Sequence, residues 1–100
     1  MTQRYARIAG VGSALPSRVV PNEELEQFVD TSDEWIFTRT GIRSRRFAGE
    51  GETAASLAAD AADRALSAAG IGPGAIDLTV VATVSGDQPL PSTASFVQER

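Results

Sequence analysis

The sequence contains no cysteine, no histidine and no lysine. Without cysteine and histidine, its 100 residues offer no disulfide, no thiolate metal site, no cysteine nucleophile and no histidine for acid–base catalysis. No apolar run approaches the roughly 18 residues that mark a membrane-spanning helix. The N-terminus also lacks the basic and then apolar pattern of a secretory signal. We therefore expect a cytoplasmic location, no membrane partner and no metal site.

The composition that is present is typical of a soluble globular protein. Apolar residues make up 42% and charged residues 22% of the chain, and the net charge is −4. Acidity of this size argues against nucleic-acid binding, although all nine basic residues are arginine and four of them fall between positions 39 and 46. The arginine cluster also lacks the interleaved aromatic residues of a nucleic-acid-binding module.

The chain is organised around residues 30–46, which hold its only tryptophan. Thr31 and Glu34 have the spacing of a capping box, and Ser32 offers a second capping oxygen. Gly41 can adopt the left-handed conformation that ends a helix. The pattern predicts a helix of about two turns, which is too short to be stable alone in water.

Trp35 and Arg39 are four residues apart and therefore share one face of this helix. An indole beside a guanidinium is a plausible platform for a planar ligand that carries phosphate, such as a nucleotide. The alternative is that Trp35 fills the core and Arg39 forms an ion pair. Arg43, Arg45 and Arg46 similarly could contact phosphates or neutralise the acidic residues before them.

The other segments indicate an α/β arrangement. We expect Asn22 to cap a helix whose apolar face holds Leu25, Phe28 and Val29. Gly10 and Gly12 lack the third glycine of a dinucleotide fingerprint, so we expect them to allow close backbone packing or a bend. The further expected elements are a strand over 5–11, a helix over 54–69 with an alanine stripe, a buried strand over 78–84, a loop over 85–91 and a helix starting at Ser92 or Thr93.

The run Asp30–Ile36, followed by Arg39–Arg43, resembles the signature of the β-ketoacyl-acyl-carrier-protein synthase III family. These enzymes are the condensing enzymes that start fatty-acid synthesis, within the thiolase-like superfamily. The match is long and ungapped. Supporting similarity to the family's first strand, a later strand and its loop is found in residues 8–12, 15–16, 80–83 and 91–92.

The resemblance implies an α/β, thiolase-like fold with layered α-β-α-β-α architecture, normally homodimeric. Residues 1–100 would be the N-terminal part of the first thiolase-like half, an incomplete fragment with no internal boundary. No catalytic residue is expected in this segment, since the family's Cys, His and Asn would lie beyond Arg100. The resemblance also implies that Thr31, Trp35 and Arg39 bind coenzyme A, and that Leu90 lies at the acyl pocket and dimer interface. Alternatively, Leu90 merely packs that interface.

The family reaction implies two partners, acyl-CoA and malonyl-acyl-carrier protein, and no cofactor beyond the coenzyme A thioester substrate. The primer expected first is acetyl-CoA, while a leucine at position 90 favours tolerance of longer or branched acyl groups. A related condensing enzyme of secondary metabolism is an alternative, and hydroxymethylglutaryl-CoA synthase fits the 30–36 run less well. A non-catalytic binding fragment is a further alternative, supported by the absence of cysteine and histidine.

Overall fold

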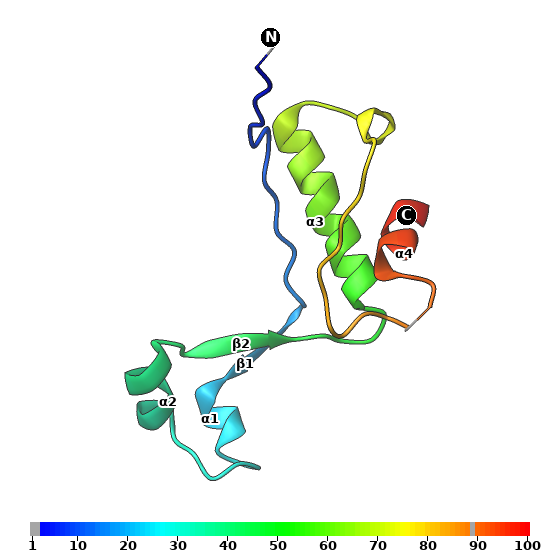
Figure 1. The fold of residues 1–100 in the computed structure, drawn as a ribbon. Helices are drawn as coiled ribbons and strands as arrows, with labels where there is room; N and C mark the ends of the chain where they lie inside the picture. The colour runs from blue at the N-terminus through cyan, green and yellow to red at the C-terminus, as the bar shows by residue number, and fades with distance from the viewer. Residues whose placement is uncertain (1–2, 89) are drawn as a thin grey trace. The chain divides into compact units, whose positions relative to one another are not determined.

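The computed structural model describes residues 3–88 and 90–100 (Figure 1). The chain forms two compact units. One consists of Leu15–Glu52, and the other of the segment up to Ala14 together with Thr53–Arg100. Each unit is described by itself below.

The unit of residues 15–52 is built on a short antiparallel ladder. Strand β1 (Arg18–Pro21) pairs with strand β2 (Ser44–Phe47), with Val20 opposite Arg45. Helix α1 (Asn22–Leu25) follows β1 directly, and helix α2 (Asp33–Thr40) precedes β2 (Figure 1). Val20 and Asn22, at the junction of β1 and α1, are fully buried.

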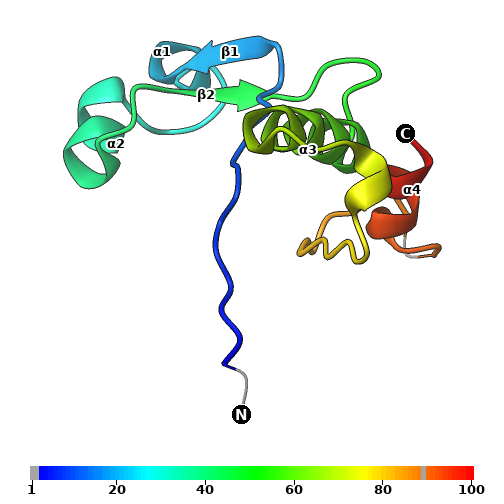
Figure 2. The same ribbon diagram turned by 90° about the horizontal axis from the view of Figure 1, so that it is seen from above.

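The other unit is built on helix α3 (Ala54–Ala69), the longest element of the described residues. The side chain of Thr53 accepts a hydrogen bond from the backbone N–H of Ser56, and Gly70 ends the helix with φ of 74°. After a 3₁₀ turn (Pro73–Ala75) and an extended stretch, helix α4 (Thr93–Glu99) packs beside α3 (Figure 2). These observations confirm the expected helix over 54–69 and the helix start at Ser92 or Thr93, with Ser92 as the N-cap and Thr93 as the first helical residue.

The N-terminal segment lies against α3 at Gly10 and Gly12, and these two glycines make that approach possible (Figure 1). A Cβ atom on Gly10 would lie 2.8 Å from the backbone nitrogen of Ala69 and closer still to the carbonyl oxygen of Ala65. A Cβ atom on Gly12 would lie 2.5 Å from the nitrogen of Ala65. The prediction that these glycines allow close backbone packing is confirmed, and the small residues of α3 form the other side of the contact.

Two segments predicted to be strands pair with no neighbouring strand in the described residues. Segments 5–11 and 78–84 are extended but unpaired, and the one ladder in the described ranges joins β1 and β2. Leu78 and Val80 are about four-fifths exposed, at 78% and 81%. A strand is defined by hydrogen bonds to a neighbour, and neither segment has such a neighbour among these residues. The apolar pattern identified their extended conformation correctly but not their pairing.

Three capping and helix predictions in residues 22–34 are wrong. Pro21, and not Asn22, is the N-cap of α1, and Asn22 uses its side chain elsewhere. Helix α1 ends at Leu25, so the expected apolar face is not formed and Phe28 and Val29 are exposed. The cap of α2 is the second candidate, Ser32, whose hydroxyl accepts a hydrogen bond from the Trp35 N–H at 3.1 Å. The capping box of Thr31 and Glu34 is therefore not formed.

Candidate functional site at helix α2

Helix α2 has well-defined ends and no buried residue. Ser32 caps its first turn, where Asp33 and Glu34 place negative charge at the positive end of the helix dipole. At the other end Gly41 adopts φ of 72° and donates its N–H to the carbonyl of Phe37 at 2.7 Å. The two-turn length and the end at Gly41 follow the expectations, and the start is capped by Ser32, the second of the two expected capping residues.

Trp35 and Arg39 form a stacked pair on the exposed face of α2. The guanidinium carbon of Arg39 lies 4.6 Å from the centroid of the Trp35 ring, in the range of a cation–π contact. Trp35 nevertheless keeps 54% of its surface exposed, so it does not fill the core that the described residues form. Arg39 forms no ion pair within residues 3–88 and 90–100. The alternative of a core tryptophan and an ion-paired arginine is therefore wrong for this structure.

Thr31 brings an unused hydrogen-bonding group next to this pair. Asp30, Thr31, Ser32 and Trp35 line a shallow pocket of about 320 Å³. The Thr31 hydroxyl oxygen is buried and has no hydrogen-bond partner in the described part of the chain. A buried polar group without a partner is uncommon in folded proteins, and a ligand can supply the missing bond. Thr31 and Trp35 thus share one pocket, and Arg39 adds a cation at the indole.

The remaining arginines of the cluster are engaged within the unit. Arg43 donates to Asp33 at 2.9 Å and also lies 3.7 Å from the centroid of the Phe37 ring. Arg45 donates to the carbonyl of Val20 at 3.0 Å, and Arg46 donates to the carbonyl of Pro16 at 3.0 Å. Arg43 therefore neutralises an acidic residue, which is the second of the two roles considered for the cluster. Arg39 is the cluster member that stacks on Trp35, one of the residues lining the pocket.

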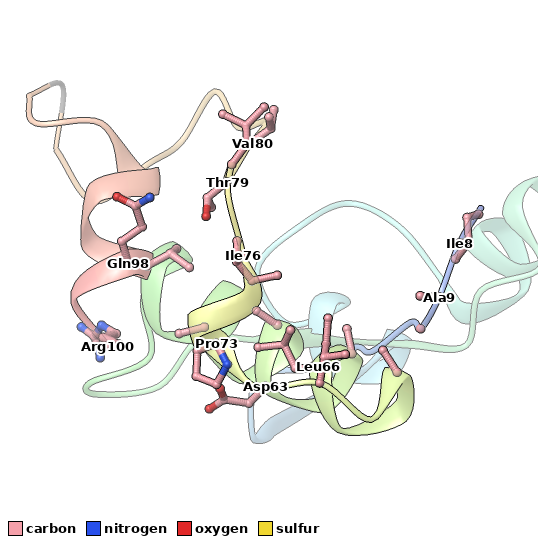
Figure 3. Close-up of a pocket in the computed structure, with 18 residues that line it drawn as sticks. Ile8, Ala9, Asp63, Leu66, Pro73, Ile76, Thr79, Val80, Gln98 and Arg100 are labelled. Atoms are coloured by element: carbon pink, nitrogen blue, oxygen red, sulfur yellow. The ribbon is translucent and has the colours of Figure 1, made fainter. Parts of the chain in front are cut away.

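Leu90 belongs to the other unit, and its side chain is 82% exposed. The same unit contains a larger hollow of about 690 Å³ between α3, the N-terminal segment and the chain after α3 (Figure 3). Its walls are mainly aliphatic, with Ile8, Leu66, Ile76 and Val80 among them, and Asp63 and Arg100 also line it. This volume is large enough for a ligand, but none of its lining residues has a buried polar atom without a hydrogen-bond partner, as Thr31 has in the described residues. We therefore place the candidate site at α2.

Two negative findings hold for the residues that the structure describes. No helix there combines the length and apolarity needed to cross a bilayer. No group of three or more carboxylate side chains is arranged to hold a metal ion in those ranges, and the sequence has no histidine or cysteine to contribute.

Solved structures identify the class of fold. The chain superposes on a 3-oxoacyl-acyl-carrier-protein synthase III from Aquifex aeolicus with a TM-score of 0.88 and 48% identity, covering 93% of this chain and 30% of that one. It superposes on the priming β-ketosynthase of a polyketide pathway with a TM-score of 0.90 and 43% identity, covering 96% of this chain and 29% of that one. The expected α/β, thiolase-like fold class is thereby confirmed, with this chain as a portion of it.

Comparison with curated relatives indicates which kind of condensing enzyme the chain resembles. A protein of Neisseria meningitidis serogroup B is 55% identical over 97 residues, which cover 97% of this chain and 30% of that protein. A protein of Paramagnetospirillum magneticum is 57% identical over 95 residues, covering 95% of this chain and 29% of its own length. Both are named β-ketoacyl-acyl-carrier-protein synthase III, so the resemblance read from residues 30–43 is confirmed. No protein-family model matches the chain.

The chain spans about 30% of the length of the curated relatives it matches.

Proposed function

We propose that this chain is part of a β-ketoacyl-acyl-carrier-protein synthase III, and that helix α2 binds the nucleotide end of its coenzyme A substrate. The observation that carries this proposal is the exposed Trp35–Arg39 stack beside the unpartnered Thr31 hydroxyl. The indole offers a surface on which an adenine can stack, the guanidinium can donate to phosphate, and the hydroxyl can bond a polar atom of the ligand. The identity of 55% to relatives with this name supports the same assignment.

The reaction we propose has two stages, as the resemblance implies. A cysteine thiolate attacks the thioester of acyl-CoA, forming an acyl-enzyme and releasing the coenzyme A thiol. Malonyl-acyl-carrier protein then loses carbon dioxide, and the resulting enolate carbon attacks the acyl-cysteine, whose thiolate leaves. Since these residues contain neither cysteine nor histidine, their part is recognition of the primer. We further propose a cytoplasmic homodimer that needs no cofactor beyond its thioester substrates.

The test is a condensation assay on the intact protein with acetyl-CoA and malonyl-acyl-carrier protein. Trp35→Ala should raise the KM for acetyl-CoA about tenfold, because stacking of one base on an aromatic ring contributes on the order of 1–3 kcal/mol. The KM for malonyl-acyl-carrier protein should not change, and Trp35→Phe, which keeps an aromatic face, should retain most of the affinity. An unchanged KM for acetyl-CoA in Trp35→Ala would contradict the proposal.

A second candidate function is priming or condensation in secondary metabolism. It is favoured by the likeness to the polyketide priming β-ketosynthase, and by a further structure titled as a tetronic acid condensing enzyme, with a TM-score of 0.78 and 33% identity. The same assay separates the two functions. Turnover of acetyl-CoA with malonyl-acyl-carrier protein supports fatty-acid initiation, whereas activity confined to other acyl donors supports the alternative.

The identity of the residue at position 90 leads to a proposal on primer choice. The resemblance implies that bacterial members of the family often have phenylalanine at this position. Leucine is smaller and more flexible, so we propose that Leu90 admits acyl groups longer or more branched than acetyl. Leu90→Phe should lower kcat/KM for butyryl-CoA relative to acetyl-CoA, measured in the same condensation assay. A ratio equal to that of the wild type would show that Leu90 only packs an interface.

A further inference from the structure

We propose that Asn22, the only asparagine of the sequence, is a positioning residue that holds helix α2 in the orientation needed to bind the nucleotide of coenzyme A. The inference rests on the function proposed above for α2. Asn22 is fully buried, at 0% exposure, although it belongs to a residue type that is mostly found at the surface. Its side chain therefore has to be accounted for by specific partners.

The amide nitrogen of Asn22 ties the first residue of α2 to the chain segment that follows the helix. Nδ2 donates to Oδ1 of Asp33, the first residue of the helix, at 2.9 Å. The same nitrogen donates to the carbonyl of Ile42, which follows the Gly41 cap, at 2.7 Å. The two acceptors are nine positions apart in the sequence, and hydrogen bonds from one nitrogen hold them close together in space.

The orientation of the Asn22 amide is set by Arg45. The guanidinium of Arg45 donates to Oδ1 of Asn22 and also to the carbonyl of Val20, the latter at 3.0 Å. Because arginine can only donate, the amide oxygen must face Arg45, and the amide nitrogen is then directed to Asp33 and Ile42. The ladder thus fixes Arg45, Arg45 fixes Asn22, and Asn22 fixes the ends of α2.

Such a clamp matters because α2 has little else to hold it. None of its residues is buried, and a helix of eight residues is marginal in water on its own. Two further polar contacts reinforce its first residue: the Asp33 N–H donates to Glu26 at 2.8 Å, and Arg43 donates to the Asp33 carboxylate at 2.9 Å. The placement of Trp35 and Arg39 therefore depends on polar bonds at the helix ends and not on apolar burial.

The decisive experiment compares acetyl-CoA with acetyl-pantetheine, which carries the same acyl thioester but lacks the nucleotide. In the intact enzyme, Asn22→Ala should lower kcat/KM for acetyl-CoA about tenfold, the order expected when buried hydrogen bonds are lost. It should leave kcat/KM for acetyl-pantetheine unchanged, because only the nucleotide contacts α2. A purely structural loss would lower both values together, and that result would overturn the proposal.

Val20→Ala is the matched control. Val20 is also fully buried and lies two residues from Asn22, but its side chain makes no polar contact with α2, and its backbone carbonyl is kept. This variant should lower Tm through the cavity it leaves while preserving the wild-type ratio of the two kcat/KM values. A shift of that ratio in Val20→Ala as large as in Asn22→Ala would also overturn the proposal.

A second variant covers the case in which Asn22→Ala fails to fold. Asn22→Asp keeps the shape of the side chain and the contact with Arg45, but it cannot donate to Asp33 or Ile42 and sets two carboxylates against each other. It should show the same selective loss with acetyl-CoA. If the wild type itself does not prefer acetyl-CoA to acetyl-pantetheine, nucleotide recognition by α2 fails; if it does and both variants match it, only the role of Asn22 fails.

Discussion

The carboxylate of Glu52 is held by several hydrogen bonds within the unit of residues 15–52. Its carboxylate accepts hydrogen bonds from the N–H of Gly49 at 2.7 Å, from the N–H of Ser17 at 3.0 Å and from the Ser17 hydroxyl at 3.0 Å. The Gly49 bond, followed by the two Ser17 bonds, lowers the pKa of Glu52 below its ordinary value because all three favour the charged form. One side chain thereby joins the segment before β1 to the loop after β2.

The pH dependence follows from the direction of this shift. Because the folded-state pKa is lowered, the stabilisation by Glu52 is complete above its unfolded-state pKa, near 4.3 for a free glutamate, and is lost as the pH falls through the folded-state value. Urea unfolding at pH 7 and at pH 3.5 should therefore show a smaller loss of stability on acidification in Glu52→Gln than in the wild type.

Glu50→Gln provides the comparison for that measurement. Glu50 is an exposed carboxylate two residues earlier, with no hydrogen bond or ion pair in the described residues. Its substitution should leave the pH dependence as in the wild type. Identical acid sensitivity of the wild type and Glu52→Gln would show that the three bonds to Glu52 do not contribute in solution.

At the scale of the elements, the N-terminal segment approaches the backbone of helix α3 closely at Gly10 and Gly12, where there is no side chain to collide with the helix. Gly12→Ala should destabilise the fold by about 1–3 kcal/mol, the usual cost of overpacking, because the new methyl group would meet the α3 backbone at Ala65. Gly74→Ala is the matched change, since a Cβ atom there has nothing within 4 Å and no strained φ. Thermal unfolding of both variants distinguishes a steric cost from a general glycine effect. Equal Tm values would refute the contact.

Elements with local signals could be predicted from the sequence. Gly41 and Gly70 marked the ends of α2 and α3, and Thr53 marked the start of α3, because the relevant hydrogen bonds link residues within one turn. The ladder of β1 and β2 was not predicted. Its strands are four residues long, one ends in proline and the other carries two arginines, so neither shows an apolar alternation.

The candidate site also has one part that could be predicted from the sequence and one part that could not. The spacing of Trp35 and Arg39 predicted their shared face, since residues four apart on a helix are neighbours. The clamp at Asn22 could not be predicted, because its partners Asp33, Ile42 and Arg45 lie 11, 20 and 23 positions away. The local pattern Pro-Asn-Glu-Glu instead indicated a helix cap, which the structure assigns to Pro21.

For the whole molecule, the most informative feature is the exposure of apolar residues in extended chain. Ile8 is 84% exposed in a segment predicted to be a strand, and Val84 is 107% exposed in a segment predicted to be a buried strand. A sheet that buries such strands on both faces requires neighbours from distant parts of a chain. The curated relatives are about three times as long as this chain, which spans about 30% of their length. The unpaired segments are therefore the positions at which the described residues leave apolar side chains uncovered.

The absence of buried residues from α2 has a consequence for amide hydrogen exchange. Opening such a helix exposes almost no new apolar surface, so its backbone N–H groups should exchange with deuterium at a low free-energy cost, whereas those of α3 should exchange more slowly. A nucleotide bound across Trp35 and Arg39 would have to be released before α2 could open. Binding would then slow exchange at residues 33–41 far more than elsewhere, and the footprint of the ligand would appear as protection of one otherwise weakly protected helix.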